Sequence, residues 1–138
     1  MRHLRAIAAI LLLTVVLMGL AYMWWVNPRP RSLASLCDLE SSQITQVLIR
    51  DGTTGEARTT SDPEQIATIL HLLTSVSYTR QVNQAPRAGY QFYVDLYETT
   101  EPVCRVTVAG QTASIGRLYY DLDRGIADEL AEIDIPEK

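Results

Sequence analysis

The sequence predicts an α+β protein, in which an N-terminal transmembrane helix precedes one small domain with an antiparallel sheet packed against two helices. Three observations support this prediction. An uncharged apolar run covers residues 6–26, short segments of alternating apolar residues fill much of residues 43–122, and two later segments have helical apolar spacing. The expected order is two strands, a helix, three to five strands and a final helix.

The run Ala6–Val26 has the length and composition of a membrane-spanning helix. At about 1.5 Å per residue it extends about 31 Å, enough to cross a hydrocarbon core of about 30 Å. Tyr22, Trp24 and Trp25 lie at its end, where aromatic side chains favour the headgroup region. We therefore expect the lipid bilayer to be a partner through residues 6–26.

The charges beside this run only weakly indicate its orientation. Arg2 and Arg5 precede it and Arg29 and Arg31 follow it, so the α-amino group shifts the balance toward an internal N-terminus. We expect residues 1–5 to be cytoplasmic, residues 27–42 to form a stalk, and residues 43–138 to form an extracytoplasmic domain at the plasma membrane.

A cleaved signal peptide is the alternative. Residues 1–5 would form its basic region, and the small residues of Gly19-Leu20-Ala21 would place cleavage near Ala21. The chain would then be secreted. Both interpretations export the same domain.

A β-hairpin and a helix are expected first in the domain. Ile44–Arg50 and Glu56–Thr60 have strand composition and flank the turn residues 51–55. Ser61 or Asp62 then caps a helix that ends near Val76 and has one apolar face.

Strands dominate the second half. A short strand is expected at Tyr78–Arg80, then a polar loop at Gln81–Gly89, which is a second candidate for contacts. The further strands expected are Tyr90–Tyr97, Pro102–Val108, Thr112–Ile115 and Leu118–Asp121. Asp123–Ile133 is expected to be a short acidic helix capped by Asp123.

The exported part is acidic. Residues 32–138 hold 8 basic and 16 acidic residues, a formal net charge of −8. Such a domain is a poor partner for nucleic acid or an anionic membrane surface.

The two cysteines, Cys37 and Cys104, allow two interpretations. In an exported chain a pair indicates a disulfide, which would close a long loop. Alternatively Cys104 is a small buried residue and Cys37 a free thiol.

The sequence contains no recognisable catalytic set. His71 is the one histidine of residues 32–138, and no Cys or His cluster has metal-ligand spacing. A Gly-x-Ser-x-Gly motif is also absent. We therefore expect no metal, no cofactor and no enzymatic activity.

The strongest candidate for a binding site is aromatic. Tyr93 and Tyr97 share one face of their predicted strand, Arg105 lies on the outer face of the next strand, and Tyr119 belongs to a later one. Tyrosine and arginine on a rigid sheet are typical of protein or glycan contact sites. The alternatives are cross-strand pairing with no partner, or a face covered by the second helix.

The order of these segments resembles that of small membrane-anchored extracytoplasmic α+β domains of Gram-positive bacteria. The residues that carry the resemblance are Ala6–Val26, the helix start Asp62-Pro63-Glu64-Gln65, the strand Tyr90–Tyr97 and the pair Tyr119-Tyr120. The resemblance implies neither an activity nor catalytic residues.

The leading hypothesis is a single-pass, non-catalytic membrane protein whose external domain binds a protein or glycan, in an accessory, sensor or inhibitor role. One alternative is a membrane-tethered hydrolase that acts on cell-wall polymer or peptide with paired carboxylates. A structural tether is the third.

Overall fold

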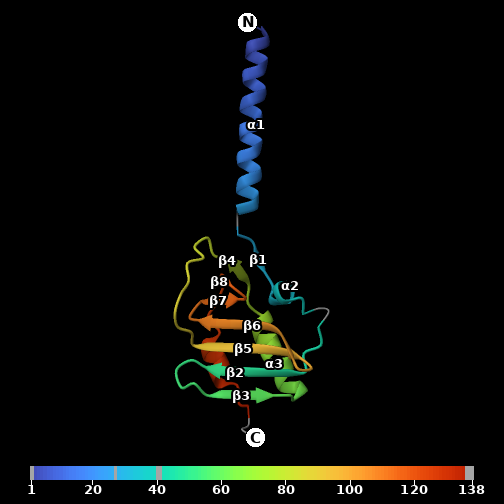
Figure 1. The fold of residues 1–138 in the computed structure, drawn as a ribbon, viewed down its shortest axis with the longest axis vertical. Coiled ribbons are helices and arrows are strands. Elements are labelled where there is room, and N and C mark those ends of the chain that lie inside the picture. Colours follow the sequence, from blue (N-terminus) through green and yellow to red (C-terminus); the bar gives the residue numbers. More distant parts are fainter. Residues whose placement is uncertain (1, 27, 40–41, 136–138) are drawn as a thin grey trace.

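The computed structural model describes residues 2–26, 28–39 and 42–135. It confirms the α+β class: a long N-terminal helix leads into a domain built on one antiparallel sheet (Figure 1). Within the described residues the sheet has eight strands, in the order β1-β4-β8-β7-β6-β5-β2-β3. The helices are α1 (Arg2–Val26), α2 (Leu33–Cys37), α3 (Pro63–Thr74) and α4 (Ala127–Glu132); the strands are β1 (Pro30–Arg31), β2 (Gln46–Asp51), β3 (Ala57–Thr60), β4 (Tyr78–Arg80), β5 (Phe92–Glu98), β6 (Glu101–Ala109), β7 (Thr112–Ile115) and β8 (Leu118–Leu122).

Helix α1 stands apart from the domain. Its segment Arg5–Trp25 has a mean hydropathy of 2.5 and none of its most apolar window is buried inside the protein. It is long and apolar enough to span a membrane or to serve as a signal sequence. Because this window is exposed along its length, its apolar side chains need a non-aqueous environment.

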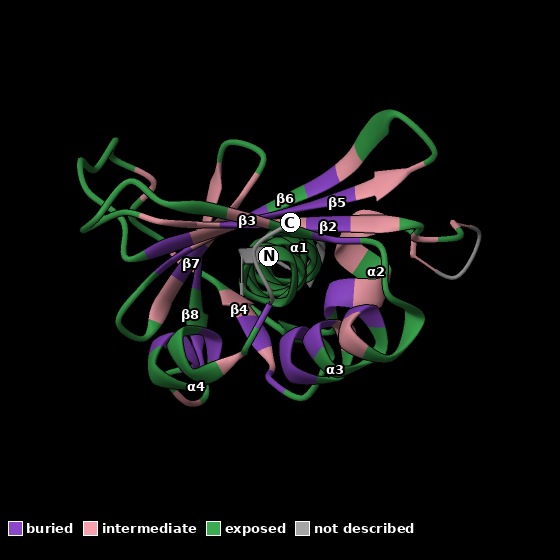
Figure 2. Cartoon of the chain, turned by 90° about the horizontal axis from the view of Figure 1, so that it is seen from below, coloured by how far each residue is buried: buried purple, intermediate pink, exposed green. Residues whose placement is uncertain are grey.

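The sheet stands edge-on to the end of α1. Strand β1 lies next to the helix, and β3 forms the far edge of the domain (Figure 1). The three short helices α2, α3 and α4 all lie on one face of the sheet, and its other face is left open (Figure 2). The domain therefore offers two distinct surfaces, an edge beside α1 and an uncovered sheet face.

The expected stalk, residues 27–42, is instead partly integrated into the domain. Pro30 and Arg31 pair with Thr79 and Tyr78 of β4, and the side chain of Leu33 is completely buried. Ser32 caps α2 by accepting a hydrogen bond from the backbone N–H of Ser35. The sequence did not indicate this because a two-residue strand and a five-residue helix carry almost no periodicity.

The core lies between the inner sheet face and the helices. Asp62 caps α3 by accepting from the N–H of Glu64, and Pro63 occupies the first turn, as the sequence predicts. Alternation along β5 and β6 buries one side of each strand. The largest fully buried side chains include Tyr78, Ile69, Leu73, Leu96, Ile126 and Leu130.

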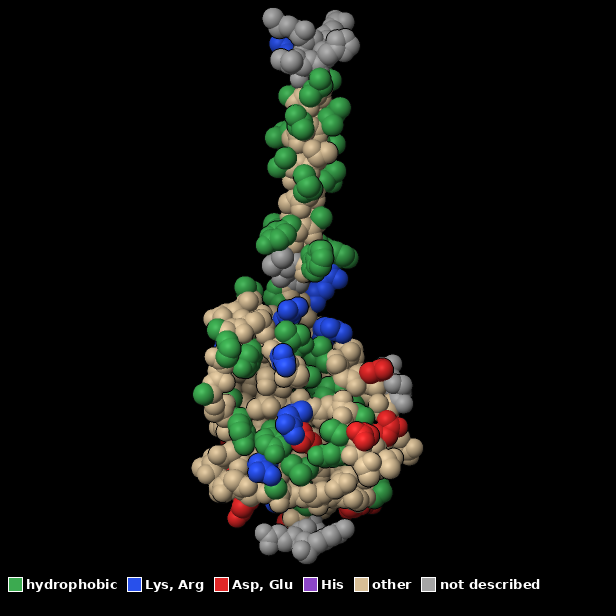
Figure 3. Space-filling model, in the orientation of Figure 1, with side chains coloured by type: hydrophobic (Ala, Val, Ile, Leu, Met, Phe, Trp, Pro, Cys, Tyr) green, Lys and Arg blue, Asp and Glu red, His purple; other side chains and the backbone are tan. Residues whose placement is uncertain are grey.

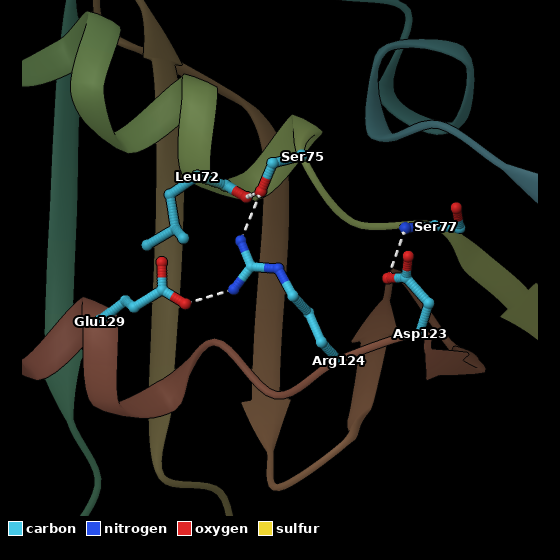
Figure 4. A network of polar contacts seen from close by, with 6 residues as sticks. All are labelled: Leu72, Ser75, Ser77, Asp123, Arg124 and Glu129. Atoms are coloured by element: carbon cyan, nitrogen blue, oxygen red, sulfur yellow. Dashed lines mark hydrogen bonds and ion pairs between the residues drawn. The ribbon is translucent and has the colours of Figure 1, made fainter.

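The last helix is shorter than predicted, because α4 begins at Ala127 and not at Asp123. The carboxylate of Asp123 accepts a hydrogen bond from the backbone N–H of Ser77, at 2.9 Å, and so does not cap the helix. The position before α4 is Ile126, whose side chain makes no capping bond. The tertiary contact with the chain before β4 has replaced the expected local one (Figure 4).

Arg124 joins the two larger helices of the domain. Its guanidinium donates to the hydroxyl of Ser75, at the end of α3, and forms an ion pair with Glu129 in α4 (Figure 4). The Ser75 hydroxyl donates in turn to the carbonyl oxygen of Leu72. These contacts are exposed, so they orient α4 more than they stabilise the fold.

A disulfide between Cys37 and Cys104 connects the end of α2 to β6, with the Cα atoms 5.6 Å apart. The bond holds the segment after α1 against the inner side of the sheet. Its loop covers a sequence separation of 67 residues. Constraining a loop of that length in the unfolded chain stabilises the fold by about 4 kcal/mol in the chain-entropy model.

We predict that the Cys37→Ser/Cys104→Ser variant unfolds at a lower denaturant concentration, with a loss of about 4 kcal/mol in the free energy of unfolding. The measurement is denaturant titration of the full chain in neutral detergent. Reductant should also change the mobility of the unsubstituted chain on a gel. Equal stability of the two proteins, with equal mobility, would contradict the bond.

Tyr78 is the largest buried side chain of the core, and its hydroxyl donates to the carbonyl oxygen of Leu73 at 2.8 Å. Burial, and secondly the charge of Asp123, raises the pKa of this hydroxyl above its ordinary value. In the pH range between the two pKa values, Tyr78 therefore keeps its proton in the folded state and loses it in the unfolded state. This contribution to stability is complete below about pH 10 and falls as the pH rises further.

We predict that the free energy of unfolding decreases above about pH 10 by about 1.4 kcal/mol per pH unit on account of Tyr78. Tyr78→Phe should lose about 1 kcal/mol at neutral pH, because the bond to Leu73 is absent, and should show a shallower alkaline decrease. Denaturant titrations at a series of pH values measure both effects. Parallel pH profiles for the two proteins would show that Tyr78 is not the titrating group.

Candidate binding face on the sheet

The predicted aromatic residues lie on the open face of the sheet. In β5 the side chains of Val94 and Leu96 are fully buried on the helix side, so Tyr93 and Tyr97 lie on the opposite side. Because α2, α3 and α4 all cover the inner face, the alternative that the last helix covers these tyrosines is wrong (Figure 2).

The pairing register places two of the candidate residues in one cross-strand row. Tyr119 of β8 pairs with Ser114, which pairs with Thr107, which pairs with Tyr93 of β5, which pairs with Arg50 of β2. Strands lie about 4.8 Å apart, so Tyr93 and Tyr119 are separated by about 14 Å. The row runs across the open face, where hydrophobic side chains, drawn in green, lie among arginine side chains, drawn in blue (Figure 3).

An ion pair stands beside this row. Asp95 of β5 is only 2 % exposed, and both its oxygens accept from Arg105 of β6, from Nε at 2.5 Å and from Nη2 at 2.6 Å. The hydrogen bond with Asp95 raises the pKa of Arg105, and the nearby hydroxyls of Tyr93 and Tyr97 add smaller contributions in the same direction. Arg105 therefore has a structural task, because it neutralises a buried carboxylate.

Tyr93 is the centre of a cation–aromatic cluster. The guanidinium carbon of Arg105 lies 4.8 Å from its ring centroid and that of Arg50 lies 5.5 Å away. The ring of Tyr90 approaches it to 5.4 Å. Arg50 is not among the predicted site residues, although its position in the alternation of β2 places it on the outer face.

Tyr119 lies under the loop that follows β4. The backbone N–H of Arg87 donates to its hydroxyl at 3.0 Å, and the guanidinium of Arg87 stacks over the ring at 5.4 Å. Gln84 exchanges two hydrogen bonds with the backbone of Tyr119, which anchors the loop to β8. The loop 81–91 thus borders a cavity of about 260 Å³ over the open face, lined by Arg87, Tyr90, Thr107, Ser114 and Tyr119 among others.

The turn between β2 and β3 fixes the other end of this loop. The N–H of Gly52 donates to the carbonyl oxygen of Gln91 at 2.7 Å. A Cβ at this glycine would lie 2.1 Å from the carbonyl oxygen of Tyr90, so only glycine allows this approach. Asp51 accepts from the N–H groups of Thr53 and Thr54, which lowers its pKa and closes the turn.

The four candidate residues do not form one compact cluster. Tyr93, Tyr97 and Arg105 lie together over β5 and β6, whereas Tyr119 belongs to the separate border formed by the loop 81–91. What the four residues share is a place on strands of one sheet, on its open face. Such a surface suits recognition of a flat macromolecular partner.

The carboxylates required by a hydrolase gather elsewhere, in a groove between α3 and α4 of about 730 Å³. Its lining includes Asp62, Glu64, Glu129, Glu132, Asp134 and His71. All five carboxylate residues are exposed, and Glu129 is paired with Arg124. Among the described residues, no group of three or more His, Cys, Asp or Glu side chains is arranged to hold a metal ion.

Comparison with known proteins adds no assignment, since no family model, curated protein or solved structure matches this chain.

We predict that Arg105→Met lowers the free energy of unfolding by about 2 kcal/mol, because it leaves the buried Asp95 without its counter-ion. Adding Asp95→Asn should restore about half of that loss, since the site then holds no charge. Denaturant titrations of both single variants and the double variant complete the cycle. Strictly additive losses would contradict the coupling of the two side chains.

Proposed function

We propose that this chain is a single-pass membrane protein, with its N-terminus inside and its domain outside the plasma membrane, that binds a protein partner through the open face of its sheet. The role is that of an accessory, sensor or inhibitor subunit and not of an enzyme. The partner face consists of Tyr93, Tyr97, Arg50 and Arg105, bordered by Tyr119.

The observation that carries this proposal is an uncovered sheet face whose central ring, Tyr93, is already packed against Arg105, Arg50 and Tyr90. Arg105 is fixed by two hydrogen bonds to Asp95 and stacks on Tyr93, so binding would immobilise few further rotamers. Preorganised aromatic and arginine side chains are the residues that dominate binding energy at protein interfaces.

The charge of this face indicates the chemistry of the partner. Arg50 and Arg87 flank the tyrosines, while Asp95 is neutralised by Arg105. A partner segment that carries carboxylates beside apolar side chains would complement this surface. A glycan would use the same tyrosine rings for stacking, and it is the competing outcome of the test below.

The hydrolase alternative is less well supported. A general acid in such enzymes needs a carboxyl group kept protonated by an apolar environment. The groove between α3 and α4 instead exposes its carboxylates to water. The groove therefore serves best as the control surface for the test of the sheet face.

We predict that Tyr93→Thr/Tyr97→Thr abolishes crosslinking of the full-length chain to a specific protein in intact membranes. Threonine keeps the strand propensity while it removes both rings, and Arg105 is left in place because Asp95 needs it. Loss of two central aromatic contacts should weaken binding by about 3 kcal/mol or more. Mass spectrometry of captured proteins is the measurement.

The matched control is Glu64→Gln/Glu132→Gln, on the helix side of the domain. Capture should persist in this control. If the control loses the captured partner and the tyrosine variant keeps it, the binding site is the acidic groove between α3 and α4 and not the sheet face. If glycosidase treatment, and not protease treatment, releases the captured partner, the partner is a glycan.

A further inference from the structure

The junction between α1 and the domain contains a cavity of about 690 Å³ that the proposed function does not use. Its lining includes Trp24, Trp25, Arg29, Arg31, Arg80 and Val82. One side comes from the end of α1, and the other from β1, β4 and the start of the loop 81–91. The volume is that of an ordinary ligand site.

The lining concentrates positive charge in an otherwise acidic domain. Arg29, Arg31 and Arg80 all contribute to it, and its described lining includes no Asp or Glu. Arginine side chains gather at this junction on the face shown in Figure 3, whereas acidic ones lie farther from α1. Although residues 32–138 have a net charge of −8, the edge of the domain beside α1 is therefore basic.

The pairing of β1 with β4 enforces this concentration. Pro30 pairs with Thr79 and Arg31 with Tyr78, so β1 brings Arg31 beside the strand that ends in Arg80. Like charges held close together repel one another, and an anion bound between them removes that repulsion. Asp121, a nearby acid of β8, accepts from the side chain of Gln81 at 2.5 Å and is not part of the lining.

The apolar residues of the junction are as exposed as the charged ones. Trp24 is 72 %, Trp25 88 % and Val82 81 % exposed, although each is a side chain that favours burial. The guanidinium of Arg29 stacks over the ring of Trp24 at 4.2 Å. Tryptophan beside arginine at the end of an apolar helix is the arrangement found at the level of lipid headgroups.

We propose that this junction binds the anionic headgroup of a membrane phospholipid. Arg31 and Arg80 hold the phosphate, while Trp25 and Val82 contact the first carbons of the acyl chains. This interaction fixes the β1–β4 edge of the sheet on the bilayer and directs the open face sideways. It rests on the part of the proposed function in which α1 spans the membrane, and it is independent of the protein partner.

The two tryptophans of the chain both line the cavity, so intrinsic tryptophan fluorescence reports on this end of α1. The experiment uses the full chain in neutral detergent, titrated with dihexanoyl phosphatidylglycerol. Dihexanoyl phosphatidylcholine and inorganic phosphate are titrated in parallel. We expect a saturable change with phosphatidylglycerol that weakens with added salt.

The test variant is Arg31→Gln/Arg80→Gln, and the control is Arg58→Gln/Arg117→Gln, two arginines that do not line the cavity. Each arginine near anionic headgroups contributes about fivefold to binding, so the test variant should bind about 30-fold more weakly. The control, with the same change in net charge, should bind as the unsubstituted chain does.

Equal responses to phosphatidylglycerol and phosphatidylcholine, or equal losses in the two variants, would overturn the proposal. Saturation by inorganic phosphate at the same concentrations would show a site for free anions and would overturn the lipid assignment. The intact mass of the chain isolated from membranes shows whether α1 is retained. Cleavage near Ala21 would remove the helix, and it would overturn both the lipid site and the proposal that α1 spans the membrane.

Discussion

The packing of α3 and α4 on one face of the sheet is the constraint on which the rest of the structure depends. Ile69 and Leu73 of α3 and Leu130 of α4 are completely buried against the inner side chains of the strands. Burial of apolar area supplies the main driving force for a domain of this size. Because both helices are used on the same side, no described element remains to cover the other face (Figure 2).

The edge-on position of the sheet then separates the surfaces of the domain. Strand order alone places β1 and β4 next to α1 and leaves β2 and β3 at the far edge. The disulfide from Cys37 to Cys104 ties the first residues after α1 to β6, so the domain cannot move freely on a long stalk.

Prediction from the sequence succeeded where a pattern is local and repeated. The alternation of β5 and β6, the capped start of α3 and the hairpin of β2 and β3 all appear in the structure near their predicted residues. The failures have a common cause. β1 and α2 are too short to show a period, and α4 starts late because Asp123 bonds to Ser77, 46 residues earlier in the chain. Such contacts between distant residues leave no trace in a local window.

The sequence by itself determined the apolar helix, the α+β class and the side of β5 on which Tyr93 and Tyr97 lie, because the periods of helix and strand are properties of neighbouring residues. Only the tertiary structure decided which strands are adjacent. Strand order and register brought Arg50 and Arg105 to Tyr93, buried Asp95, and separated Tyr119 from the other candidates. Register depends on how all the strands fit one hydrophobic core, so it is a property of the whole domain and not of any single segment.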